Sequence, residues 1–175
     1  HGAQVGLINV AEEVHGAPVG LLSFVKQGQL HLELWSSDIM LTNVGVKLGG
    51  RHVYSTFVAG FDPTDRLQRF SLGAGLGVHI PLGTRFWVDV DAVGSSVQPL
   101  REPFTGDNLL AQARAMVGFQ ILPRLAVFAA PTYNVYLAFS PEDRRDMTRF
   151  TSRERPQDNG GSMQYWPGLQ LGLRL

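Results

Sequence analysis

Two long stretches of alternating apolar and polar residues lie between Arg69 and Val97. In the first, apolar side chains recur at every second position, namely Phe70, Leu72, Ala74, Leu76, Val78 and Ile80. A β-strand points successive side chains to opposite faces, so the apolar set occupies one face and the polar residues and glycines the other. Residues 81–83 form a turn signal, and a second alternating stretch begins at Phe86. The pattern predicts a long β-hairpin.

The same alternation continues through the rest of the chain. Further strands are expected at 19–25, 30–35, 39–48, 53–61, 111–121, 125–139 and 163–175. The arms of the central hairpin exceed ten residues, roughly twice the usual length in soluble proteins. Long strands of alternating polarity joined by turns are typical of a transmembrane β-barrel. With one further strand before residue 19, we therefore predict an all-β, antiparallel up-and-down transmembrane β-barrel of ten strands, or of eight if the first two segments lie outside it.

The connections and the small residues predict which face points inward. Short turns at 26–29, 49–50, 82–84 and 123–124 contrast with long loops at 62–67, 98–107 and 140–161. Outer-membrane barrels keep short turns on the periplasmic side and long loops outside. Glycines fall on the polar face, which suits a narrow lumen, and the apolar face carries aromatics near the strand ends: Phe61, Phe70, Phe86, Phe119, Phe139 and Trp166. A soluble lipocalin-like barrel with an apolar interior has the same period and stays an alternative.

A repeat of fourteen residues opens the chain. Residues 1–7 recur as 15–21 with one difference, Gln4 against Pro18. The repeat is either a copied strand and turn within the barrel or the end of a longer upstream array. With Gly6, Leu7, Asn9 and Ala11 it resembles the Gly-Leu-x-Asn-x-Ala repeats of bacterial surface-repeat proteins. We expect one domain over 1–175, with the repeat inside 1–28.

Composition narrows the functional class. Charged residues make up 17% of the chain, against about 25% in ordinary globular domains, and the net charge is zero. No basic field is present to attract nucleic acid. No apolar run reaches the eighteen or so residues of a membrane-spanning helix. The sequence has no cysteine. It also has no positively charged, apolar leader at His1, which predicts a removed signal peptide or a start inside a longer protein.

The polar face supplies the candidate functional residues. The expected lumen-lining set is Glu33, Lys47, Arg69, His79, Asp89, Asp91, Arg114 and Arg174. Such charges can neutralise one another in a salt-bridge network that fills the lumen, or they can line a path for ions. Asp89 and Asp91 share one face near His79, but no hydrolase, phosphate-binding or zinc motif accompanies them. We therefore expect no enzyme activity, no metal and no cofactor.

The pattern as a whole resembles the small, porin-like outer-membrane β-barrel proteins of Gram-negative bacteria, including the alternating final strand that serves as their assembly signal. The chain ends in Leu175, where that family usually ends in Phe. The resemblance implies an outer-membrane location and a structural anchor or surface-presenting role. A narrow porin-like channel is the first alternative and a soluble lipocalin-like barrel the second.

The resemblance also implies a set of partners. Membrane lipid is expected around the barrel, including lipopolysaccharide of the outer membrane. A long loop whose charges sum to zero carries five arginines, Arg144, Arg145, Arg149, Arg153 and Arg155. We interpret it as a solvated loop, with contact to anionic lipid headgroups as the alternative. Guanidinium groups match phosphate well. A partner protein or an upstream repeat region is expected as well, and no nucleic acid.

Overall fold

The computed structural model describes residues 4–11, 18–25, 29–64, 68–100, 108–140, 147–148, 152–156 and 161–175. Its strands are β1 (Gln4–Ala11), β2 (Pro18–Val25), β3 (Gln29–Ser37), β4 (Thr42–Gly49), β5 (Val53–Asp62), β6 (Arg69–Leu82), β7 (Phe86–Pro99), β8 (Asn108–Leu122), β9 (Leu125–Ala138), β10 (Arg153–Pro156) and β11 (Ser162–Arg174). Among the described residues, no helix is long and apolar enough to cross a membrane.

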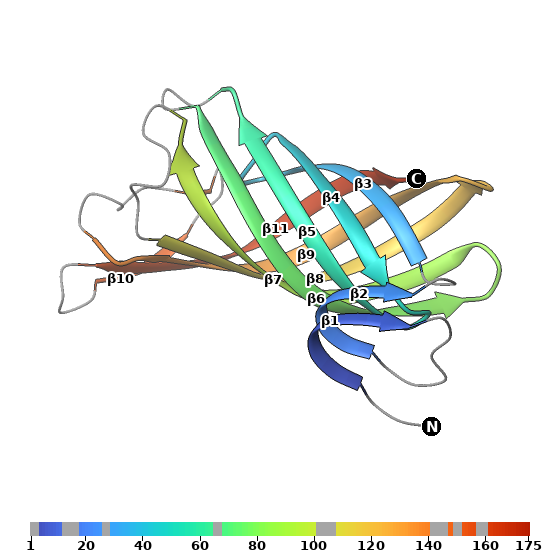
Figure 1. The fold of residues 1–175 in the computed structure, drawn as a ribbon. Coiled ribbons are helices and arrows are strands. Elements are labelled where there is room, and N and C mark those ends of the chain that lie inside the picture. The colour runs from blue at the N-terminus through green and yellow to red at the C-terminus, as the bar shows by residue number, and fades with distance from the viewer. Residues whose placement is uncertain are drawn as a thin grey trace.

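Eight of these strands close into an antiparallel barrel (Figure 1). Strands β3 to β9 follow one another in sequence order, and β11 pairs with both β9 and β3, so the sheet closes on itself. The predicted up-and-down barrel is therefore confirmed. Short β10 pairs with β11 beyond the barrel wall.

The count of ten barrel strands is wrong, and the alternative of eight is confirmed. Strands β1 and β2 form a separate sheet in which they run parallel to one another. Neighbours in an up-and-down barrel must run antiparallel, and the place beside β3 is taken by β11, with Leu173 opposite Leu34. The first two segments consequently lie outside the barrel.

The two faces of the barrel wall are sorted as the alternation predicts. Leu76 in β6 and Leu171 in β11 are 41% and 57% exposed, whereas Asp89 in β7 and Arg114 in β8 are 1% and 2% exposed. Every barrel strand contributes at least one exposed large apolar side chain. The charged groups of the wall thus point into the interior, and apolar groups cover the outside.

The connections place both ends of the barrel chain on one side. The short turns 50–52, 83–85 and 123–124 lie at the same end as Gln29 and the C-terminus (Figure 1). At Gly83 the backbone has φ = 80°, a conformation that glycine adopts without steric cost. Strand β2 lies against β4 and β5 near this end. The ends of β5, β7 and β9 and the short strand β10 lie at the opposite end (Figure 1).

The β3–β4 connection differs from its prediction. Residues 39–41 were expected to open a strand, but β4 begins only at Thr42. Ile39 and Met40 instead lie in a turn and are buried. Ser37 and Asn43 hold this turn, since Asn43 Nδ2 donates a hydrogen bond of 2.9 Å to the Met40 carbonyl oxygen and Ser37 Oγ donates one of 3.1 Å. The turn folds into the barrel mouth instead of extending the wall.

Candidate functional site

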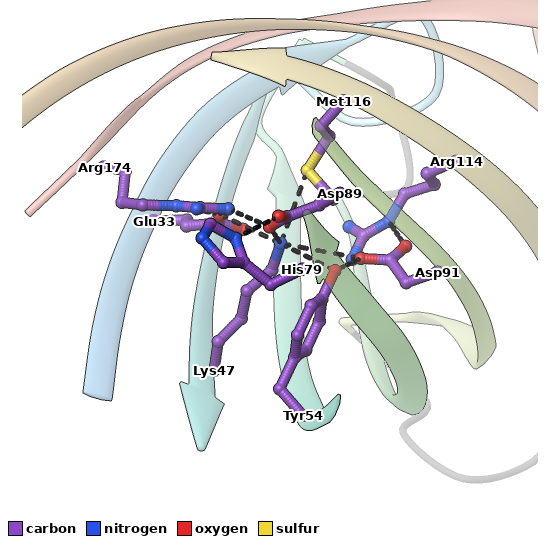
Figure 2. A network of polar contacts seen from close by, with 9 residues as sticks. All are labelled: Glu33, Lys47, Tyr54, His79, Asp89, Asp91, Arg114, Met116 and Arg174. Atoms are coloured by element: carbon purple, nitrogen blue, oxygen red, sulfur yellow. Dashed lines mark hydrogen bonds and ion pairs between the residues drawn. The ribbon is translucent and has the colours of Figure 1, made fainter. Parts of the chain in front are cut away.

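Nine interior side chains form one connected polar network (Figure 2). They are Glu33, Lys47, Tyr54, His79, Asp89, Asp91, Arg114, Met116 and Arg174. Seven of the eight barrel strands contribute to it: β3, β4, β5, β6, β7, β8 and β11. Because contacts run from one part of the wall to the other, the network braces the lumen across its width.

Asp91 is the centre of one half of the network. Its two carboxylate oxygens accept hydrogen bonds from Arg114 Nε at 2.5 Å and Arg114 Nη2 at 2.9 Å, in the bidentate geometry that suits guanidinium. The Tyr54 hydroxyl donates to Asp91 Oδ2 at 2.9 Å. Lys47 Nζ lies 3.6 Å from the same oxygen. Arg114 is held by this carboxylate and is almost fully buried.

Lys47 links this half to the other. Its Nζ atom lies 2.8 Å from Asp89 Oδ2 and 3.2 Å from Glu33 Oε1, and it donates to Tyr54 Oη at 3.1 Å. Arg174 bonds Glu33 Oε1 through Nε at 2.8 Å and also contacts Asp89. His79 Nδ1 lies 2.6 Å from Asp89 Oδ1. Two carboxylates and two cations therefore share one compact cluster.

The charges of the network balance. Three cations, Lys47, Arg114 and Arg174, face three carboxylates, Glu33, Asp89 and Asp91, with all six nearly inaccessible to solvent. An unpaired charge in such a place is very costly, whereas a paired and hydrogen-bonded one is tolerated. The arrangement occupies every carboxylate with a fixed cation. It is therefore suited to holding strands together more than to transferring protons.

Aromatic side chains pack around the cations at the short-turn side. The Arg174 guanidinium stacks 3.4 Å from the centre of the Trp87 ring, and Arg114 lies 5.5 Å from that of Trp35. Trp87 and Trp35 belong to a buried cluster with Met116, Ala126, Phe128 and Ala130. Trp87 and Ala126 are the second residues of β7 and β9, and each of these strands follows a short turn. The cluster adjoins the polar network directly, since Met116 belongs to both.

Glycines on the inner face make room for these rings. A Cβ atom on Gly118 would overlap the Trp87 indole. A Cβ atom on Gly172 would stand 2.6 Å from both Phe128 Cζ and Trp35 Cβ. The glycine face predicted from the alternation is thus the face against which the aromatic rings lie.

A second buried cluster closes the long-loop side. It consists of Ile39, Met40, Val97, Leu110, Tyr136, Ala138, Met147 and Trp166. Trp166 Nε1 donates a hydrogen bond of 2.7 Å to Asp38 Oδ2, which also accepts from Thr148 Oγ1 at 3.2 Å. These bonds join the inward-folded β3–β4 turn to β11 and to the loop before it. The inward-folded turn at residues 38–41, named the plug turn below, thus packs its apolar side chains inside this end of the barrel.

Three buried polar side chains converge on Gly168. Asp38 Oδ1, Thr132 Oγ1 and Asn134 Nδ2 are buried and have no hydrogen-bond partner among the described residues. All three atoms lie 2.5–2.6 Å from the point where a Cβ atom would stand on Gly168. These atoms crowd the place of a Cβ atom, so the site has room for glycine only.

The sequence-predicted set is largely brought together, with one member apart. Glu33, Lys47, His79, Asp89, Asp91, Arg114 and Arg174 all join the network. Arg69 stands at the start of β6, near the long loops, with Nη1 3.1 Å from Met147 Sδ. Sequence reasoning missed Tyr54 as a network member, although its position on the inner face was available from the alternation.

The structure places some of the predicted girdle aromatics and loop arginines on the outside of the barrel, but not all of them. Trp166 was assigned to the outer girdle, which is wrong, because it is 1% exposed and points inward to Asp38. Phe86 and Phe119 do pair on the outer face beside the short turns, with ring centres 4.9 Å apart. Arg153 and Arg155 are exposed on β10. The other three loop arginines lie outside the described residues.

No metal site is formed by the described part of the chain, in which no group of three or more His, Cys, Asp or Glu side chains could hold an ion.

No protein-family model matches the chain, and no curated protein or solved structure is significantly similar to it.

Proposed function

We propose that the protein is an outer-membrane β-barrel with a plugged lumen that works as a structural anchor. The observation that carries the proposal is the inverted burial: charged side chains such as Asp89 and Arg114 are enclosed while leucines such as Leu76 and Leu171 are exposed. A soluble monomer seldom exposes a contiguous apolar patch of more than a few hundred Å². An apolar belt to which all eight strands contribute is the surface expected of a barrel in lipid.

The strand lengths support the same proposal. Strands β6, β7 and β9 have 14 residues each. At about 3.4 Å per residue such a strand is ~44 Å long, and at the ~40° tilt of closed barrels it rises ~34 Å. The hydrocarbon core of a bilayer is about 30 Å thick. The wall is thus tall enough to cross it.

Orientation follows from the proposal. Outer-membrane barrels place short turns in the periplasm and long loops outside. The C-terminus and the β1–β2 sheet lie with the short turns, so both face the periplasm. Strand β10, with Arg153 and Arg155, faces outward, where lipopolysaccharide phosphates are the matching ligand. The barrel would then anchor the repeat segment on one side and present loops on the other.

The contents of the lumen favour an anchor over a channel. A charge-balanced network spans the interior, with a buried cluster on either side of it. Eight-stranded barrels have an interior just wide enough for side chains to fill. A narrow porin-like channel would need both the plug turn at 38–41 and the Trp87 cluster to move aside.

Two measurements test the proposal on the purified chain. Folded protein mixed with phospholipid vesicles should float with them in a density gradient and resist extraction at high pH. Recovery as a stable soluble monomer without amphiphile would contradict the membrane assignment and favour the lipocalin-like alternative. In planar bilayers the inserted protein should give no steady unitary current. Regular current steps would contradict the plugged anchor and favour the porin-like channel.

A further inference from the structure

The β1–β2 sheet reproduces the sequence repeat in space. Gln4 lies beside Pro18 and Ala11 beside Val25, so partners are always fourteen residues apart. The two copies of the repeat in residues 1–7 and 15–21 are separated by the same fourteen residues. Equivalent positions of successive repeats therefore stand side by side in parallel strands.

The link between the two strands is short for a parallel pair. Only the six residues 12–17 separate Ala11 from Pro18. Parallel strands in ordinary sheets need a crossover of a dozen or more residues, usually with a helix. One strand plus a short return per repeat is the plan of a β-solenoid, in which each unit contacts only its neighbours.

The β1–β2 sheet contacts the barrel through β2 and has an outer edge at β1. Strand β2 lies against β4 and β5 of the barrel. Among the described residues β1 pairs with β2 alone. The outer edge of β1 therefore presents backbone N–H and C=O groups that can pair with another strand.

We propose that this edge of β1 binds a further copy of the fourteen-residue repeat, placed ahead of β1 in the same polypeptide. The added strand lies parallel to β1 with each residue beside the residue fourteen positions later, which repeats the relation between β1 and β2. Residues 4–25 are then the barrel-proximal end of a β-solenoid. The proposal does not depend on the membrane assignment, because it concerns only the β1–β2 sheet.

The test extends the full chain by one additional copy of residues 1–14. A control carries the same fourteen residues in scrambled order. About half of the β1 amides point away from β2, and amide hydrogen exchange should slow at these positions by roughly ten-fold or more in the repeat extension only. Equal exchange in β1 with the repeat and the scrambled extension would refute the proposal.

Proline variants identify the edge directly. Ile8 and Asn9 are consecutive in β1, so their amides point to opposite edges. Proline removes the donor, and the variant whose amide points outward should keep β1–β2 protection yet lose the gain from the added repeat. If neither Ile8→Pro nor Asn9→Pro removes that gain, the added copy does not pair there. Protection of β1 that rises with the concentration of the unextended chain would identify a second chain as the occupant instead.

Discussion

Replacing Asp91 with asparagine removes a charge from the centre of the lumen without changing the size of the side chain. The Asp91→Asn variant loses the carboxylate that holds Arg114 through two hydrogen bonds and that also accepts from Tyr54. Arg114 is 2% exposed, so it has no access to bulk water. The variant therefore leaves a guanidinium buried without its partner.

The expected cost follows from that geometry. Breaking a buried ion pair by removing one partner costs about 3–5 kcal/mol, because the remaining charge is uncompensated. The folded-to-unfolded ratio should thus fall by roughly two to four orders of magnitude. Arg114→Gln should also destabilise the barrel, since Asp91 then keeps only Tyr54 and the more distant Lys47. The double variant should cost less than the two single costs added together, by about 1–3 kcal/mol.

Urea unfolding in lipid or detergent measures these free energies. Trp35, Trp87 and Trp166 all point into the barrel, so their fluorescence reports the opening of the lumen. Glu154→Gln on exposed β10 is the control, and it should change stability by less than about 0.5 kcal/mol. A cost below about 1 kcal/mol for Asp91→Asn, with additive single variants, would refute the claim that the network braces the barrel.

Three further substitutions separate the outer face, the inner glycines and the plug. Leu76→Arg, in the middle of β6, should lower the free energy of unfolding in lipid by about 2–4 kcal/mol, whereas Leu82→Arg, at the end of β6, should lower it by about 0–1 kcal/mol. Equal losses for the two variants in urea titration would argue against a lipid-facing belt. Gly118→Ala should lower the free energy of unfolding by about 1–3 kcal/mol, because the new methyl group overlaps Trp87. Gly94→Ala is the control, and it should leave stability nearly unchanged because its Cβ atom would stand 3.7 Å from Leu109. The reverse order of the two effects would contradict the packing of Trp87 on Gly118. Trp166→Phe removes the hydrogen bond to Asp38, so it should cost about 1–3 kcal/mol and speed amide exchange at 37–41; unchanged exchange there would show that this bond does not hold the plug.

The alternation predicted the wall of the barrel well because a strand has a fixed period of two. Once Phe70 to Ile80 was assigned to one face, Ser71 and the intervening glycines had to occupy the other. The same period assigned Asp89, Asp91 and Arg114 to the polar face, and the loop lengths and glycines predicted that this face points inward. It could not assign their partners, because cross-barrel contacts such as Lys47 with Asp89 depend on how eight strands stagger when the sheet closes.

The strand count and the plug exceeded what alternation can predict. Residues 19–25 have a strand pattern, but the pattern does not say whether the neighbour is β1 in parallel or a barrel strand. The fourteen-residue repeat was the available signal, since copies of one sequence favour stacking in register. Ile39 and Met40 fitted an apolar strand, and only the hydrogen bonds of Asn43 and Ser37 show why the chain turns inward there.

The accessibility of the outer face to lipid-soluble and water-soluble probes tests most directly whether the apolar belt faces lipid. The sequence has no cysteine, so single cysteines at Leu72, Leu76, Val90 and Leu171 can carry a nitroxide label in vesicles, with Glu154 as the water-exposed control. If the belt faces lipid, oxygen should relax the first four labels more than a water-soluble nickel complex does, with the opposite order at Glu154. Labels at all five positions that respond more strongly to the nickel complex would show that the apolar belt does not face lipid.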